Sequence, residues 1–167
     1  MTDESERTRN FSWGDPQRTA RLAPITNGLD LLRAILRGEL PAPPITAALG
    51  LELAEVEVGR VVFTMTPAEY HYNPIGSVHG GVAATLLDSA MGCAVNTLLP
   101  AGVAYTTLEL KVNYLRPMTR NTGEVRAEGS VLHLGGKTAL AEGKLLGPDG
   151  KLYAFATTTC LILRPGA

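Results

Sequence analysis

Cysteine is scarce in this sequence: its 167 residues include two, Cys93 and Cys160. Two thiols cannot build the network of several disulfides that holds small secreted domains together. Each lies in an apolar stretch, where a free thiol usually behaves as a small hydrophobic side chain. No pair of Cys or His residues has the spacing of a zinc site. The sequence therefore predicts neither a disulfide framework nor a bound metal.

An excess of charge is also lacking, because 15 Lys and Arg residues face 16 Asp and Glu residues and leave a net charge of −1. This balance predicts no general attraction to nucleic acid or to an anionic membrane. No run of 18 apolar residues occurs, and the N-terminal stretch MTDESERTRN contains no hydrophobic signal region. Hydrophobic residues make up 45% of the chain, as in globular domains. We expect a soluble, cytoplasmic protein.

The chain divides into three parts by composition. Residues 1–24 are charged and poor in aliphatic side chains, which predicts a flexible N-terminal arm. Residues 25–44 form a short helix, at about 27–38, and a connector that prolines keep extended. The helix places four apolar residues on one side: Leu29, Leu32, Ile35 and Leu36. Residues 45–167 form the main domain.

Six segments of the main domain have strand patterns: 49–58, 60–67, 103–116, 122–134, 137–147 and 151–163. Turns are predicted at Gly59, at Gly135-Gly136 and at the sequence GPDG, residues 147–150. One long helix, at about 79–98, separates the first two strands from the other four. A parallel sheet would need repeated crossover helices, which are absent. The order predicts an α+β fold with an antiparallel sheet of five or six strands wrapped around one long central helix.

The long helix is apolar on most sides, which predicts burial on most sides. Its polar residues follow one line, at steps of +3, +4, +7 and +11: Thr85, Asp88, Ser89, Gly92 and Asn96. A carboxylate is almost never buried without a partner, because its desolvation is costly. Asp88 is therefore either a structural partner of a nearby Arg or backbone amide, or a functional group in a cleft.

The helix begins with His79-Gly80-Gly81. Unpaired N–H groups at a helix N-terminus stabilise a negative oxygen, and glycines let a substrate carbonyl approach them closely. This arrangement predicts an oxyanion hole. The alternative is that the glycines only permit a tight turn from the loop into the helix. Helix starts favour Ser, Thr, Asp or Asn, so His-Gly-Gly is an unusual choice for capping alone.

The spacing along the helix separates the two candidate groups. Nine residues, from His79 to Asp88, correspond to about 900° of rotation and a rise of about 13.5 Å. One chain cannot easily bring its own Gly80 amide and Asp88 carboxylate to the same carbonyl. Two chains related by a two-fold axis can, if each site takes the helix end of one and the acid of the other.

The pattern Asn73-x-x-Gly76-x-x-His79-Gly80-Gly81, followed by Asp88 and Gly92, resembles the PaaI-like acyl-CoA thioesterases of the hotdog fold. The strand TTLELKVNYLRP, residues 106–117, also resembles the segment that follows the helix in that family. The similarity extends over about residues 45–164. It implies hydrolysis of an acyl-CoA by a homodimer, which in the family often pairs into a homotetramer. It implies no metal or other cofactor, because a thiolate is already a good leaving group.

The resemblance also implies roles for individual residues. The Gly80 amide would polarise the thioester carbonyl, and Asn73 would position the reacting water or the thioester. Asp88 of the partner chain would act as general base or as nucleophile. His79 would support the loop or bond near the thioester.

A hydroxyl on the strand after the helix would assist the water. Counting back from Tyr114 makes Thr107 the best match, while the loop at 99–104 leaves Thr106 open. Strict alternation favours Thr107, because it places Thr106 on the supposed core face with three apolar residues: Leu108, Leu110 and Val112.

Arg116 and Arg120 could bind the phosphates of coenzyme A, since Arg makes bidentate phosphate contacts, or they could be solvated surface charges. The acyl group, which could be aryl or a short or medium chain, is not encoded in any local motif. A protein of the same fold that binds acyl-CoA without turnover is the main alternative, since a fold alone does not determine function.

Overall fold

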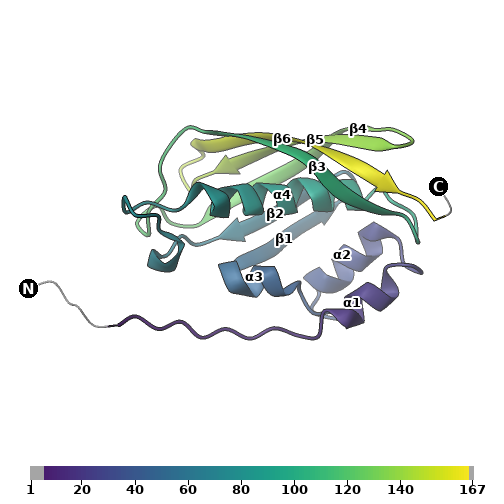
Figure 1. Ribbon diagram of the computed structural model, residues 1–167, viewed down its shortest axis with the longest axis horizontal. Helices are drawn as coiled ribbons and strands as arrows, with labels where there is room; N and C mark the ends of the chain where they lie inside the picture. Colours follow the sequence, from purple (N-terminus) through teal and green to yellow (C-terminus); the bar gives the residue numbers. More distant parts are fainter. Residues whose placement is uncertain (1–5, 166–167) are drawn as a thin grey trace, which may run out of the picture.

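The computed structural model describes residues 6–165 and contains one antiparallel sheet around one long helix (Figure 1). Three short helices come first: α1 (Gln17–Leu22), α2 (Gly28–Leu36) and α3 (Pro44–Leu49). Strands β1 (Leu51–Glu57) and β2 (Arg60–Met65), a 3-10 turn η1 (Glu69–His71) and the long helix α4 (Gly80–Asn96) follow. Four strands complete the chain: β3 (Ala104–Tyr114), β4 (Val125–Leu134), β5 (Thr138–Leu146) and β6 (Leu152–Leu163).

The sheet has six strands in the order β1-β2-β4-β5-β6-β3, and every neighbouring pair is antiparallel. The predicted α+β fold, with a sheet around one central helix, is therefore confirmed. Because β3 crosses to the far side of β6, it forms one edge of the sheet, while β1 forms the other. The segment that contains α4 carries the chain from β2 to this distant edge, and the connection from β3 to β4 carries it back beside β2.

Helix α4 lies directly on the inner face of the sheet. A Cβ atom on Gly129 in β4 would lie 2.4 Å from the carbonyl carbon and oxygen of Ala90, so helix and sheet backbones touch there. Small buried residues on β4 itself and on β5 and β6 allow the same approach: Ala127, Ala139, Ala141, Ala154 and Ala156. Around this contact α4 buries Leu86, Leu87 and Met91 completely. Burial of each such side chain contributes about 1.5–3 kcal/mol.

The segment before the sheet differs in part from the prediction. Helix α2 is present, but Leu36 is 40% exposed and Leu31 is buried, because Leu36 is the last helical residue and no neighbour covers it. The predicted extended connector is wrong at its end, where Pro44 begins α3. Proline fits the first turn of a helix, where its missing N–H is not needed.

The described part of the predicted arm, residues 6–24, includes α1 and contacts the domain. The Arg9 guanidinium donates to the carbonyl of Ala47, at 2.8 Å, and to that of Ala48. It also lies over the rings of Phe11 and Tyr70. Residues 1–5 of the arm and residues 166–167 of the domain lie outside the described residues.

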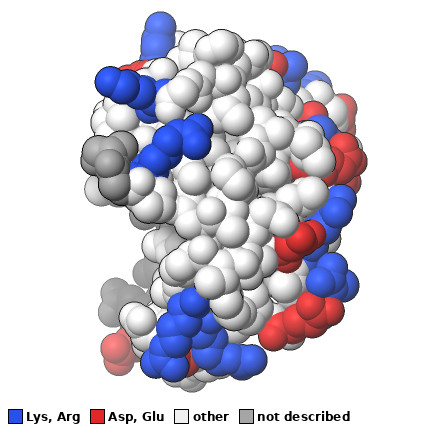
Figure 2. Space-filling model, turned by 90° about the vertical axis from the view of Figure 1, so that its right-hand side faces the viewer, with Lys and Arg blue, Asp and Glu red and all other residues white. Residues whose placement is uncertain are grey.

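Charged side chains are spread around one end of the molecule. Figure 2 shows the side of the molecule on which the C-terminus lies in Figure 1; its centre is uncharged, and Lys, Arg, Asp and Glu occupy its rim. This face has no concentration of one charge sign of the kind that attracts nucleic acid.

Candidate active site

His79 caps helix α4 with its side chain. Its Nδ1 accepts a hydrogen bond from the Gly81 N–H at 2.9 Å. A Cβ on Gly81 would lie 3.0 Å from that Nδ1, so a glycine makes room for the capping ring. His79 therefore serves as the helix cap, because an imidazole nitrogen accepts a hydrogen bond as a carboxylate or hydroxyl oxygen would.

The Gly80 N–H, in contrast, has no acceptor among residues 6–165. Because the cap engages Gly81, the amide of Gly80 is available to a ligand at this helix start. The Tyr114 hydroxyl donates to the Gly80 carbonyl at 3.0 Å, and a Cβ on Gly80 would lie 3.1 Å from Tyr114 Cζ. This tyrosine therefore fixes the orientation of the peptide and packs closely against Gly80.

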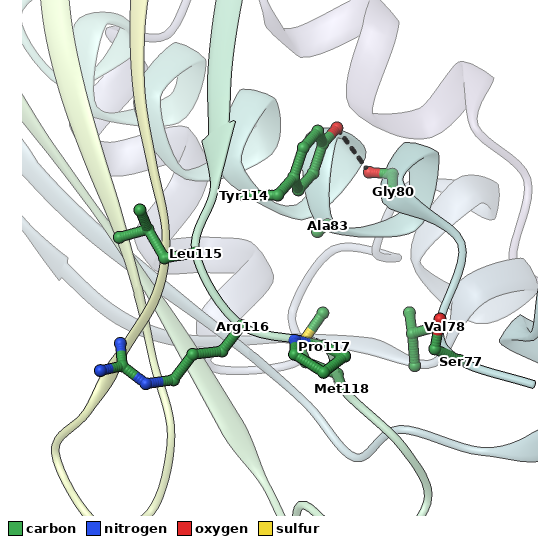
Figure 3. A pocket seen from close by; sticks show the side chains of 9 residues that line it. All are labelled: Ser77, Val78, Gly80, Ala83, Tyr114, Leu115, Arg116, Pro117 and Met118. Atoms are coloured by element: carbon green, nitrogen blue, oxygen red, sulfur yellow. Dashed lines mark hydrogen bonds between the residues drawn. The ribbon is translucent and has the colours of Figure 1, made fainter.

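A cleft of about 280 Å³ opens at Gly80 (Figure 3). Ser77 and Val78 form one side of it, and the segment from Tyr114 to Met118, which leaves β3, forms the other. Figure 3 shows the Tyr114 hydroxyl directed at the Gly80 carbonyl, while the side chain of Arg116 extends away from both. The cleft thus leads from the helix start toward a guanidinium at its rim.

Asn73 closes the loop before the helix. Its Oδ1 accepts from the N–H groups of Ile75 and Ser77, at 3.1 and 3.2 Å, and its Nδ2 donates to Ser77 Oγ at 3.1 Å. The next turn of this loop uses Gly76 at φ +80°, which favours glycine. The loop is tied to the helix start by the backbone bond from His79 N–H to the His71 carbonyl, at 2.8 Å.

Asp88 is half-buried at the middle of α4 and accepts a hydrogen bond from Thr107 on β3, with 2.9 Å between the oxygens. Among residues 6–165 it forms no ion pair, so the alternative of a structural partner for an Arg finds no support. A half-buried carboxylate with one hydroxyl donor retains lone pairs for a water or a substrate.

Strict strand alternation favours Thr107, and Thr107 is the threonine that contacts Asp88. The argument itself is wrong, because the strand does not alternate strictly. The register of β3 against β6 shifts between Thr107 and Glu109, a bulge that reverses the alternation. As a result Thr107 faces the helix on one side of the bulge, and Leu110 and Val112 face the core on the other. Thr106 and Leu108 are exposed instead.

Two separate groups of predicted site residues result. Asn73, His79 and Gly80 gather at the start of α4. Asp88, which Thr107 contacts, lies eight residues after Gly80 on the same helix, roughly 12 Å further along its axis. The cleft at Gly80 is not lined by Asp88. Within one chain the two groups do not form a single site.

The two arginines lie at the surface. Arg116 donates to the Leu152 carbonyl, and Arg120 pairs with Glu69 at 2.7 Å, a carboxylate that also pairs with Arg7. Arg116 borders the cleft at Gly80, and Arg120 does not.

Two tyrosines of β3 belong to this region, although the sequence assigns them no role. Tyr114 contacts Gly80, as described, and Tyr105 lies over Gly92, where an added Cβ would be 2.6 Å from the phenol oxygen. The two tyrosines are nine residues apart on a strand that runs along α4. This spacing is the signal in the sequence that both face the helix, but the bulge between them breaks the alternation that would reveal it.

Both thiols have raised pKa values. Burial raises the pKa of Cys93 to about 12, and the charge of Asp88 adds to the increase. Burial likewise raises the pKa of Cys160, with a smaller contribution from Asp88. Both therefore remain protonated at neutral pH and are poor nucleophiles.

No helix within residues 6–165 is long and apolar enough to cross a membrane. Over the same described range, no three His, Cys, Asp or Glu side chains group closely enough to hold a metal ion.

The sheet and its central helix define a hotdog fold, and comparisons with known proteins identify the family. A model of the thioesterase superfamily matches residues 75–154. The chain is 32% identical over 134 residues to the medium/long-chain acyl-CoA thioesterase YigI of Salmonella typhimurium, covering 71% of this chain and 85% of that protein. It is 28% identical over 115 residues to the 1,4-dihydroxy-2-naphthoyl-CoA hydrolase of Listeria monocytogenes, covering 68% of this chain and 91% of that protein.

Among solved structures, a phenylacetic acid degradation-related protein of Ralstonia eutropha JMP134 superposes with a TM-score of 0.71 at 31% identity. The match covers 78% of this chain and 98% of that one. The chain belongs to the thioesterase superfamily, in its PaaI-like group with the hotdog fold. It is a thioester hydrolase.

Proposed function

We propose that two copies of the chain hydrolyse an acyl-CoA thioester in sites that each combine Gly80 of one copy with Asp88 of the other. The observation that carries the proposal is the division of one chain's chemistry into two places. An unpaired Gly80 amide and a Thr107-bonded carboxylate are separated by roughly 12 Å on the same helix. Coenzyme A as the leaving group is supported by the names of the two relatives, which both act on CoA thioesters.

The chemistry follows from what each group can do. The Gly80 N–H donates to the thioester oxygen, which becomes negative as the carbonyl carbon turns tetrahedral. Asp88 either accepts a proton from water while that water attacks the carbonyl carbon, or attacks the carbon itself. In the second case water then hydrolyses the mixed anhydride. Either route breaks the C–S bond, releases the CoA thiolate and yields the free acid.

Other residues position the reactants. Thr107 holds Asp88 by its hydrogen bond, and Tyr114 holds the Gly80 peptide by its own. Asn73 maintains the loop before the helix through its hydrogen bonds to Ser77. Because this loop leads directly into Gly80, Asn73 could exchange one of these bonds for a bond to a water or to the thioester. His79 supports the site as the helix cap.

The cleft at Gly80 is the place we assign to the arm of coenzyme A. Its rim carries Arg116, whose guanidinium can donate to a phosphate. Arg120 lies further out and would share its five donors between Glu69 and a phosphate.

Strand β3 is the contact that we propose for the dimer. It ends the sheet order, spans 11 residues and so offers an unpaired row of backbone groups to a second β3 related by a two-fold axis. Exposed apolar side chains accompany it, including Leu108, Tyr114 and Leu115. Pairing of dimers into a tetramer, like a cytoplasmic location, stays a prediction.

The test is the Asp88→Ala variant, assayed by release of free thiol from a panel of aromatic and aliphatic CoA thioesters. Loss of the base or nucleophile lowers kcat by about 10²-fold or more. Glu52→Ala, at an exposed position on β1, is the matched control and keeps wild-type turnover. Near-wild-type thiol release by Asp88→Ala would show that the assignment is wrong, and tight acyl-CoA binding without turnover by the wild type would indicate a binding protein.

A further inference from the structure

Strand β3 contacts α4 at successive turns of the helix (Figure 1). Thr107 bonds Asp88, with 2.9 Å between the oxygens. Two residues earlier on the strand, Tyr105 lies over Gly92, where an added Cβ would be 2.6 Å from the phenol oxygen and 2.9 Å from Cε2. Gly92 follows Asp88 by four residues, which is about 40° of rotation and roughly 6 Å of rise. The Tyr105 ring therefore occupies the turn of the helix directly after the Asp88–Thr107 pair.

A cavity of about 130 Å³ lies beyond this ring. Tyr105 lines the cavity together with Asn96, which is one turn after Gly92 on α4, and with Leu31 of α2. Neither Asp88 nor Gly92 belongs to its lining. Because Tyr105 both covers Gly92 and lines the cavity, its ring separates the cavity from the reacting carboxylate.

The helix surface beneath the ring is free of large side chains. Asp88, Gly92 and Asn96 follow one another at steps of four and so share one side of α4. The glycine between the other two has no side chain, and the ring of Tyr105 occupies the space that one would need. Without this ring, a path of roughly 12 Å would run along the helix from Asp88 to the cavity at Asn96.

Tyr105 affects the site by its size and not by its acidity. Burial raises the pKa of its hydroxyl well above the ordinary value, so the hydroxyl stays protonated at neutral pH. The ring packs against the hydrophobic core, which holds it over the helix. We therefore treat it as a wall of the site.

The two-chain arrangement determines the direction in which an acyl group extends from Asp88. The cleft at Gly80 of the other copy is assigned to the arm of coenzyme A, so the acyl group on the far side of the carbonyl extends away from that cleft. Toward the start of its own helix, Asp88 faces the second site of the dimer, which the two-fold axis places there. The direction left for the acyl group is toward Gly92 and the Tyr105 ring.

We infer that Tyr105 is the end wall of the acyl site and limits the substrate to short acyl chains. The inference rests on the proposed function. One helical turn, roughly 6 Å of rise, separates Asp88 from the level of the ring, and this length holds only a few carbons. A longer chain must displace the ring, and the cavity at Asn96 is the space that its end would enter.

The experiment measures kcat/KM of the full-length protein for acetyl-, butyryl-, hexanoyl- and octanoyl-CoA by thiol release. The wild type favours the two shorter substrates. Tyr105→Ala removes the ring and raises kcat/KM for octanoyl-CoA relative to butyryl-CoA by about tenfold or more. Tyr105→Phe keeps the ring, loses only the hydroxyl and is the matched control with the wild-type profile.

A double variant locates the end of the longer chain. Asn96→Met fills the cavity, since methionine adapts its shape to irregular gaps. Combined with Tyr105→Ala it reverses the gain with octanoyl-CoA, whereas alone, behind the intact ring, it keeps the wild-type profile. A gain that persists in the double variant overturns the cavity as the place of the chain end.

Tyr105→Leu guards against a folding defect, because it keeps a large apolar side chain and removes the ring. It shifts the profile in the same direction by a smaller factor, and a ratio of two substrates does not depend on the folded fraction. Unchanged ratios in Tyr105→Ala and Tyr105→Leu, or a wild type that already favours octanoyl-CoA, overturn this inference and leave the proposed function intact. Absence of hydrolysis of every CoA thioester by the wild type, aromatic ones included, overturns the proposed function and this inference with it.

Discussion

Asp88 and Thr107 are 19 positions apart in the sequence and meet because β3 runs along α4. Sequence reasoning finds Asp88, since a lone acid on an apolar helix requires an explanation. It does not find the partner with certainty, because the two neighbouring threonines differ by the bulge that follows them. Likewise nothing local indicates that the ring of His79 caps the helix or that Tyr114 bonds the Gly80 carbonyl.

The pair of neighbouring threonines provides a direct comparison. Thr107→Val keeps the shape of the side chain and removes the hydrogen bond to Asp88, so the carboxylate loses its fixed position. We expect kcat to fall about 10–100-fold with a smaller change in KM. Thr106→Val, on the exposed face, changes both constants less than two-fold. Equal effects of the two substitutions would contradict a positioning role for Thr107.

At the level of elements, long periodic segments are predictable and short ones are not. All six strands and α4 lie within a few residues of their predicted bounds, because alternation and helical patterning extend over many residues. Helix α3 is missed, because its six residues begin with a proline that equally fits an extended connector. The order of the strands depends on contacts between distant segments, of which Gly129 under α4 is one.

The contact between β4 and α4 can be tested at Gly129. A methyl group added there would collide with the backbone at Ala90, so Gly129→Ala should lower the free energy of unfolding by about 1–3 kcal/mol. Gly136→Ala is the control, since nothing lies within 4 Å of its added Cβ and its φ is not positive. Urea denaturation of both variants measures the difference. If Gly129→Ala were as stable as Gly136→Ala, helix and sheet would not be in backbone contact.

At the scale of the whole molecule, the proposed site requires more than one chain. The rise of a helix separates Gly80 from Asp88, so the separation predicted from the sequence is also present in the folded chain. The edge strand β3 could not be located from the sequence, because its place beside β6 follows from the crossover. If the proposed two-chain site is correct, activity should fall when the protein is diluted below its dimer dissociation constant.

The most direct test of the two-chain site combines two inactive variants. Gly80→Pro removes the proposed oxyanion donor at the first helical position, where proline is tolerated, and Asp88→Ala removes the carboxylate. Each protein alone should show little thiol release. After mixing by unfolding and refolding together in equal amounts, half of the dimers contain one of each chain, and each of these has one intact site. The account predicts recovery of about a quarter of wild-type activity. A mixture that stays as inactive as its two parents, although mixed dimers form, would contradict a site shared between chains.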